Sequence, residues 1–210
     1  MDSVFFVFEI IGVVAFSLSG AMLALKCGMD IFGVCVLGLT TAVGGGIIRD
    51  ILLGITPPTS LVNPVYALIA IAVSAFTFLP FMQKFLCHTH KAYNRLLLLA
   101  DSIGLGIFTV IGVNACFVKG YQQVFMCVIL GVITGVGGGV MRDVMSKNMP
   151  YIFVKHFYAC ASIIGALSCA LLFNICGRLI SMLVGMTVII ILRFLAAKFH
   201  WELPKPSAFK

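Results

Sequence analysis

The stretch Gly-Gly-Gly-Ile-Ile-Arg-Asp at residues 44–50 places three glycines and two opposite charges inside an apolar segment. It returns 93 residues later as Gly-Gly-Gly-Val-Met-Arg-Asp, at residues 137–143. At the same offset, three flanking residues are repeated: Gly38, Thr41 and Pro57 as Gly131, Thr134 and Pro150. At an offset of 92, five earlier residues are matched: Glu9, Gly12, Phe16, Gly20 and Gly28 by Asp101, Gly104, Phe108, Gly112 and Gly120. The chain therefore contains two copies of one structural unit.

The chain of 210 residues is too apolar for a soluble fold. Hydrophobic residues make up 61% of it and charged residues 10%, whereas a soluble domain has about 45–50% and about 25%. This composition predicts an integral membrane protein, in contact with the lipid bilayer, with one compact domain over residues 1–210. The net charge of +7 does not predict a nucleic-acid partner, because the basic residues lie in short segments between apolar runs.

Seven apolar runs are long enough, at about 20 residues, to cross a bilayer as helices. They cover residues 4–25, 32–53, 61–82, 96–118, 124–145, 152–173 and 179–199. Repeat one (4–82) and repeat two (96–173) hold three runs each, and the segment 177–199 has no twin. Because three spans reverse the direction of the chain, the second repeat is inverted relative to the first. The predicted fold is an all-α membrane protein with seven transmembrane helices, two inverted three-helix repeats plus a seventh helix.

Lysine and arginine in the loops predict the orientation of the chain. One set of alternating loops, together with the tail at residues 200–210, holds most of the basic residues: Lys26, Lys84, Lys91, Arg95, Lys147, Lys198, Lys205 and Lys210. The other set holds only Lys119 and Arg178. The positive-inside rule therefore predicts a multi-pass protein of the cell inner (plasma) membrane, with the N-terminus outside and the C-terminal tail in the cytoplasm.

The glycine triplets have two interpretations. Each glycine in a helix interior costs about 1 kcal/mol relative to alanine. Small residues at every fourth position let membrane helices approach closely, which accounts for one glycine of each triplet. Three in succession also favour a kink or local unwinding, as in the broken helices that form the sites of inverted-repeat proteins. The predicted pore-kink residues are Gly44, Gly45, Gly46, Gly137, Gly138 and Gly139.

Ionisable residues near both triplets are candidate pore charges or gates, because charges inside a membrane are costly and mark ion or substrate pathways. They are Glu9, Arg49, Asp50, Asp101, Arg142 and Asp143. Adjacent residues on a helix do not face each other, so Arg49 need not pair with Asp50, nor Arg142 with Asp143. The repeat instead predicts two symmetric ion pairs, Glu9–Arg49 near the outer mouth and Asp101–Arg142 near the inner mouth.

Hydroxyl side chains complete a predicted polar path at mid-membrane, lined by Ser17, Ser19, Thr41, Thr109 and Thr134. Neutral oxygen dipoles suit a monovalent cation that sheds its water, so K⁺ or Na⁺ would be the permeant species. The sequence shows no phosphate-binding loop, nucleophile elbow or metal motif. We therefore expect no catalytic residues, no metal site and no cofactor, and hence no enzyme.

The doubled Gly-Gly-Gly-x-x-Arg-Asp motif, within seven spans over residues 4–199, resembles the prokaryotic members of the trimeric intracellular cation (TRIC) channel family. The bacterial sequences of that family are also labelled a glycine-transporter family. The resemblance implies a homotrimer in which each protomer has its own pore, between the glycine-kinked spans 2 and 5. It implies that this pore passes potassium and other monovalent cations.

Three functions stay open on the residues themselves. The first is a potassium-permeable channel for monovalent cations. The second is a secondary transporter for glycine or another small amino acid, because a half-helix N-terminus at a glycine break can hold a carboxylate. The third is a membrane scaffold in which the glycines only pack helices.

Overall fold

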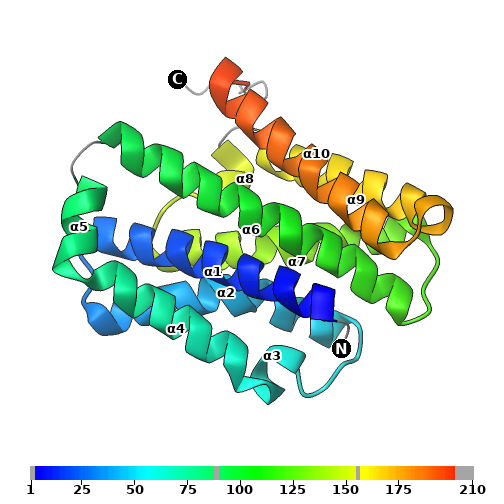
Figure 1. Cartoon of the computed structure of the whole chain (residues 1–210), viewed down its shortest axis with the longest axis horizontal. Helices are drawn as coiled ribbons and strands as arrows, with labels where there is room; N and C mark the ends of the chain where they lie inside the picture. Colours follow the sequence, from blue (N-terminus) through cyan, green and yellow to red (C-terminus); the bar gives the residue numbers. More distant parts are fainter. Residues whose placement is uncertain (1–2, 88–89, 155–156, 202–210) are drawn as a thin grey trace.

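The structure is a computed structural model that describes residues 3–87, 90–154 and 157–201. Throughout these residues the regular structure is helical (Figure 1). The helices are α1 Ser3–Lys26, α2 Ile31–Leu52, α3 Thr59–Val62, α4 Pro64–Phe78, α5 Pro80–Cys87, α6 His90–Val118, α7 Val124–Met145, α8 Tyr151–Val154, α9 Tyr158–Cys176 and α10 Arg178–Phe199. The predicted cytoplasmic tail at 200–210 lies outside the described residues, apart from its first two positions.

Among the described residues, six helices are long and apolar enough to cross a membrane: α1, α2, α6, α7, α9 and α10. The structure thus confirms an all-helical, multi-pass chain, but it does not confirm a count of seven spans. The predicted third span, 61–82, is divided among three helices, and its longest part is α4 with 15 residues. At about 1.5 Å per residue, α4 is shorter than a hydrocarbon core of about 30 Å.

Local chemistry explains why this third segment is divided. The side chain of Asn63 accepts a hydrogen bond from the Val65 amide and so caps α4, and Pro64 occupies the first turn of the helix. Proline is tolerated there because the first amides of a helix have no partner within it. Pro80 ends the same helix, since the residue before a proline is pushed out of the helical conformation. Leu79 is accordingly extended, with ψ 142°.

The two repeats make equivalent contacts. Helices α1, α2 and α4 pack against one another, and so do α6, α7 and α9. The halves meet where α2 crosses α7 and where α1 lies along α6, at the centre of the bundle (Figure 1). Helix α10 packs on α9 and α6 of the second repeat. The repeat in the sequence is therefore a repeat of helix packing, and α10 is an addition to one half.

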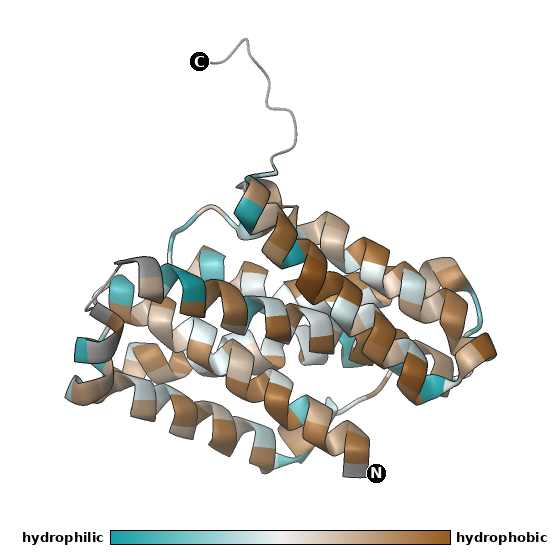
Figure 2. Cartoon of the chain, turned by 45° about the horizontal axis from the view of Figure 1, so that its top comes forward, coloured by the Kyte–Doolittle hydropathy of each residue, from teal (hydrophilic) through white to brown (hydrophobic). Residues whose placement is uncertain are grey.

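Apolar residues predominate along the helices of the bundle (Figure 2), and many of their side chains are exposed. Large side chains on it, such as Phe32, Phe125 and Ile175, are 76%, 78% and 79% exposed. Continuous apolar surface of this kind is costly in water and mild in lipid. Several charged and hydroxyl side chains are instead buried between the helices. Apolar residues outside and polar residues inside are the arrangement expected of a membrane protein whose interior carries its function.

Candidate functional site

The crossing of α2 and α7 is built on the middle glycine of each triplet. A Cβ atom on Gly45 would collide with the carbonyl oxygen of Thr134 on α7, and a Cβ on Gly138 would collide with the carbonyl oxygen of Thr41 on α2. These two contacts are equivalent in the two repeats. Only glycine allows the two backbones to approach so closely. The middle glycines therefore set the distance between the two central helices.

Neither glycine triplet interrupts its helix in this structure. Helix α2 continues through Gly44–Gly46, and α7 continues through Gly137–Gly139. The physical reason is the crossing itself, because close backbone contact offsets the low helix propensity of glycine. The outermost glycines have a different environment. A Cβ on Gly46 would lie 3.8 Å from the guanidinium of Arg49, and a Cβ on Gly139 would lie 3.0 Å from the Tyr158 hydroxyl and 3.8 Å from the guanidinium of Arg142.

One charged group, the first-repeat cluster, consists of Glu9, Arg49, Asp50 and Tyr66. Arg49 Nε donates to Asp50 Oδ1 at 2.8 Å. Asp50 Oδ2 accepts the backbone amide of Thr59 at 2.8 Å, just beyond the end of α2. The hydroxyl of Tyr66 donates to the Glu9 carboxylate. Helices α1, α2 and α4 of one repeat thus supply the whole cluster.

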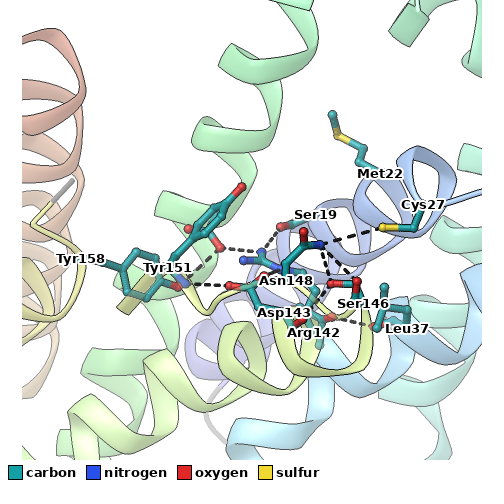
Figure 3. A network of polar contacts seen from close by, with 12 residues as sticks. Ser19, Met22, Cys27, Leu37, Arg142, Asp143, Ser146, Asn148, Tyr151 and Tyr158 are labelled. Atoms are coloured by element: carbon teal, nitrogen blue, oxygen red, sulfur yellow. Dashed lines mark hydrogen bonds and ion pairs between the residues drawn. The ribbon is translucent and has the colours of Figure 1, made fainter. Parts of the chain in front are cut away.

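The equivalent group, the second-repeat cluster, consists of Asp101, Arg142, Asp143 and Tyr158. Figure 3 shows Arg142, Asp143 and Tyr158 of this cluster. Arg142 Nη1 donates to Asp101 Oδ1 at 2.7 Å, and Arg142 Nε donates to Asp143 Oδ1 at 2.8 Å. Asp143 Oδ2 accepts the amide of Tyr151 at 2.9 Å, as Asp50 accepts that of Thr59. The Tyr158 hydroxyl lies 3.4 Å from Asp101 Oδ1. Arg142 is 0% exposed.

Two neighbouring elements tie the second-repeat cluster to the rest of the bundle. Arg142 Nη1 also donates to Ser19 Oγ on α1, across the boundary between the repeats. The ring of Tyr151, outside the spanning helices, lies 5.1 Å from the Arg142 guanidinium. Burial raises the pKa of Tyr151, which keeps its hydroxyl neutral beside the charges.

The predicted Asp101–Arg142 ion pair is confirmed, and its counterpart is wrong. Glu9 binds the Tyr66 hydroxyl, and Arg49 pairs with Asp50 instead. Adjacent residues do pair in both motifs, although their Cβ atoms point apart. The arginine side chain is long enough to fold back to the neighbouring carboxylate, whose second oxygen is held by an amide beyond the helix end. Each aspartate therefore fixes its arginine and the following loop together.

The sequence interpretation missed two tyrosines and an arginine. Tyr66 and Tyr158 occupy equivalent positions, 92 residues apart. The same offset relates Glu9 to Asp101, so it was a signal that could have identified the two tyrosines. Arg193 lies on α10 and donates from Nη2 to Asp101 Oδ2 at 3.2 Å. It has no equivalent in the first repeat, so the repeat gave no signal for it.

The predicted polar lining is buried, and three of its hydroxyls bond within their own helices. Thr41 and Thr134 each donate to the carbonyl four residues earlier at 2.6 Å, and Ser17 donates to Val14 O at 3.1 Å. The other two make contacts between helices, because Ser19 accepts from Arg142 and Thr109 Oγ1 lies 2.8 Å from Ser162 Oγ. In this conformation the hydroxyl groups form hydrogen bonds within helices or between packed helices.

Two cavities approach the clusters from opposite ends of the bundle. The larger, about 510 Å³, reaches Glu9, Arg49 and Asp50 and is walled on other sides by Lys119 and Arg178. The smaller, about 270 Å³, is lined by Arg95, Tyr151 and Arg193, among others. Arg49 is 8% exposed, whereas Arg142 is 0% exposed. The first-repeat cluster therefore opens to a cavity, and the second-repeat cluster is sealed.

Between the first-repeat cluster and the glycine crossing lies a pair of aromatic rings. Phe16 and Phe108, which are equivalent in the repeat, have ring centroids 5.2 Å apart. Phe108 lines a space of about 30 Å³ beside Glu9 and Arg49, and a Cβ on Gly138 would lie 3.4 Å from the Phe16 ring. The centre of the bundle is thus apolar and closely packed in this conformation.

Comparisons with known proteins agree with this geometry. The family model described as "Glycine transporter" matches the chain over residues 6–81 and 98–174. The UPF0126 inner membrane protein YadS of Escherichia coli (strain K12) is 38% identical over 199 residues, 93% of each chain. The UPF0126 membrane protein YvgT of Bacillus subtilis (strain 168) is 32% identical over 199 residues, 95% of each chain.

Solved structures give the same result. A TRIC cation channel studied for its conductance is 40% identical, with a TM-score of 0.85 over 97% of this chain and 98% of that one. The TRIC orthologue from Rhodobacter sphaeroides is 30% identical, with a TM-score of 0.86 over 95% and 100%. A prokaryotic TRIC channel in 0.5 M KCl is 32% identical, with a TM-score of 0.88 over 97% and 100%. These similar proteins are described as membrane proteins and channels, not as enzymes.

Proposed function

Since this chain belongs to the glycine-transporter family of prokaryotic TRIC channels, we propose that it is a potassium-permeable channel for monovalent cations. The pore runs through each protomer, between α2 and α7. The observation that carries this proposal is the arrangement at the crossing, where Gly45 and Gly138 meet the opposite backbone between two equivalent clusters of buried charge.

The buried charges support a pathway rather than a purely structural role. A buried ion pair pays a large desolvation cost and is weak evidence for stability. Inside a membrane, such groups face the bundle interior and mark ion routes. Here equivalent positions of both repeats carry the arginine–aspartate pair. In the proposed channel these clusters stand at the two mouths, and the permeant K⁺ or Na⁺ passes between them.

The glycine crossing supplies the movement that conduction requires. The rings of Phe16 and Phe108 close the centre of the path. At one end of the path, Arg142 is completely buried. At the crossing, the backbones of α2 and α7 meet directly at Gly45 and Gly138. Such a contact can separate or bend without repacking a core, and three glycines in each helix lower the cost of a kink. The pore-kink role of both triplets is part of this proposal.

The proposal includes the arrangement in the membrane. The short helix α4, extended by its neighbours α3 and α5, acts as a third span, which gives seven spans and makes the second repeat inverted relative to the first. The N-terminus then faces outward and the C-terminus inward. The first-repeat cluster accordingly lies at the outer mouth and the second-repeat cluster at the inner mouth. A homotrimer in the inner membrane is proposed from the similarity to the TRIC channels.

Reconstitution of the purified full-length protein in a planar bilayer with a KCl gradient tests this function. Unitary current steps that reverse near the potassium equilibrium potential are expected. The alternative, a secondary transporter for glycine or another small amino acid, would instead give saturable glycine uptake into proteoliposomes without current steps. A protein with neither activity would be a scaffold. Either of the last two results would overturn the channel.

A further inference from the structure

Arg193 is a charged residue that the repeat does not account for. It lies near the C-terminal end of α10 and is 1% exposed. Its Nη2 is 3.2 Å from Asp101 Oδ2, and its guanidinium stacks over the Tyr158 ring at 4.6 Å. A fully buried arginine needs strong compensation in a membrane. The second-repeat cluster supplies that compensation.

Asp101 is consequently shared by two arginines from two helices. Its Oδ1 accepts from Arg142 on α7 at 2.7 Å, while its Oδ2 accepts from Arg193 on α10. The carboxylate on α6 thus joins three helices through charge-assisted bonds, which are the strongest type of hydrogen bond in proteins. In the first-repeat cluster, Glu9 is the counterpart of Asp101 and accepts a hydrogen bond from the Tyr66 hydroxyl.

The two clusters differ in their number of arginines and in their access to a cavity. The first-repeat cluster has one arginine, Arg49, and opens to the cavity of about 510 Å³. The second-repeat cluster has a pair of carboxylates matched by Arg142 and Arg193, and Arg142 is completely buried. The cavity of about 270 Å³ on that side is lined by Arg193 and Tyr151. These two side chains therefore separate water in that cavity from the rest of the cluster.

We propose that Arg193 is the latch of the inner mouth: its bond to Asp101 holds α10 against α6 and keeps this mouth shut. This inference rests on the proposed channel function and assigns a residue of the seventh helix to its control. When Arg193 leaves Asp101, the cavity reaches the carboxylate. The route of a cation then loses the repelling positive charge of Arg193, and Oδ2 of Asp101 loses its partner and faces the cavity.

The latch can be removed without leaving a buried carboxylate unpaired. Asp101 keeps Arg142 at 2.7 Å when Arg193 is replaced. Replacing a buried charge by a side chain of similar volume is tolerated best when no opposite charge is stranded. Arg193→Gln is the principal variant. Arg193→Met, which keeps the packing of the methylene stem, is the second variant if the first does not fold.

The matched control is Lys198→Gln. Lys198 lies on the same helix and at the same end of the bundle, but it is exposed and its Nζ lies over the Phe199 ring at 5.5 Å. The Lys198→Gln substitution removes one positive charge from α10, as Arg193→Gln does, and leaves the contacts of Asp101 unchanged. Arg193→Lys is the conservative variant, since it keeps a positive charge that can still face Asp101.

Two measurements on the full-length protein in proteoliposomes test the latch: potassium flux, and amide hydrogen exchange over the peptide that contains Asp101. Arg193→Gln is expected to raise flux several-fold and to speed exchange, while Lys198→Gln leaves both at the wild-type level and Arg193→Lys falls between the two. If the wild type conducts potassium and Arg193→Gln changes neither the flux nor the exchange rate, the latch is overturned and the channel proposal stands.

The exchange measurement keeps the two proposals separable. If the wild-type protein carries no potassium flux, the channel proposal fails and exchange alone decides whether Arg193 seals the cluster. Faster exchange at Asp101 in Arg193→Gln would then support the seal, and an unchanged rate would overturn it. If Lys198→Gln raises the flux as much as Arg193→Gln does, the latch is also overturned, because the increase would then be a general effect of charge on α10.

Discussion

The carbonyl oxygen of Thr134 on α7 lies where a side chain on Gly45 of α2 would begin. The equivalent contact joins Gly138 and Thr41, so the two central helices touch through their backbones at two related points. Small residues have this role in many membrane interfaces. Here the same contact lies between the two charge clusters, so that packing and proposed conduction depend on the same glycines.

Replacing a middle glycine by alanine should separate α2 from α7. We expect Gly45→Ala and Gly138→Ala each to lower the free energy of unfolding by about 1–3 kcal/mol, the usual range for overpacking a core. Titration with SDS in mixed micelles measures this. Gly46→Ala is the control, since its Cβ would lie 3.8 Å from the nearest side-chain atom, a guanidinium nitrogen of Arg49. It should be neutral or stabilising by up to about 1 kcal/mol. A loss for Gly46→Ala as large as that for Gly45→Ala would contradict the close crossing.

The two symmetric acids should differ in their importance for stability. Asp101→Asn removes the charge that Arg142 and Arg193 share, and breaking a buried ion pair costs about 3–5 kcal/mol. Glu9→Gln keeps an acceptor for the Tyr66 hydroxyl and lies at a cavity, so its expected cost is about 1 kcal/mol or less. Unfolding midpoints of both variants in the same detergent decide the order. A Glu9 variant as unstable as the Asp101 variant would refute it.

The two symmetric tyrosines should show the reverse order. Tyr66→Phe removes the hydroxyl that binds Glu9, and a hydrogen bond to a charged group contributes about 1.5–3 kcal/mol. Tyr158→Phe removes a hydroxyl 3.4 Å from Asp101, a carboxylate that two arginines already hold. We expect Tyr158→Phe to cost less than Tyr66→Phe in thermal unfolding. A larger loss for Tyr158→Phe would mean that its hydroxyl is essential to the second-repeat cluster.

Native cysteines test the proposed orientation. Cys27 follows α1 and Cys176 ends α9, and both are exposed. With the N-terminus outside, Cys176 faces outward and Cys27 faces the cytoplasm. A membrane-impermeant maleimide applied to right-side-out vesicles should label the wild type but not Cys176→Ser, and the labelling of Cys27→Ser should equal that of the wild type. The opposite pattern would invert the topology.

The sequence predicts more of the helical organisation than of the contacts. Apolar runs locate the six long apolar helices of the described residues to within six residues at each end, because a run of that length must be helical in lipid. The third run is divided among three helices because Pro64 and Pro80 interrupt it, and overall hydropathy does not show a broken backbone. The repeat also identified Asp101 as the partner of Arg142.

Contacts set by side-chain reach could not be predicted from spacing. Adjacent residues point apart on a helix, yet Arg49 folds back to Asp50, whose other oxygen is held by an amide beyond the helix. A triplet of glycines indicates equally a break and a close approach, and only the position of α7 beside Gly45 shows which occurs. Arg193 carried no signal, because a residue outside a repeat has no twin to mark it.

The paired contacts Gly45–Thr134 and Gly138–Thr41 form an interface in which each partner offers the other the same surface. That is the defining property of a two-fold homodimer. Each cluster of charges is also drawn from the residues of a single repeat, with Ser19 and Arg193 as additions from elsewhere. The chain thus has the geometry of two identical subunits fused end to end, as gene duplication of a three-helix ancestor would leave it. Helix α10 is the addition that gives one half a partner the other lacks.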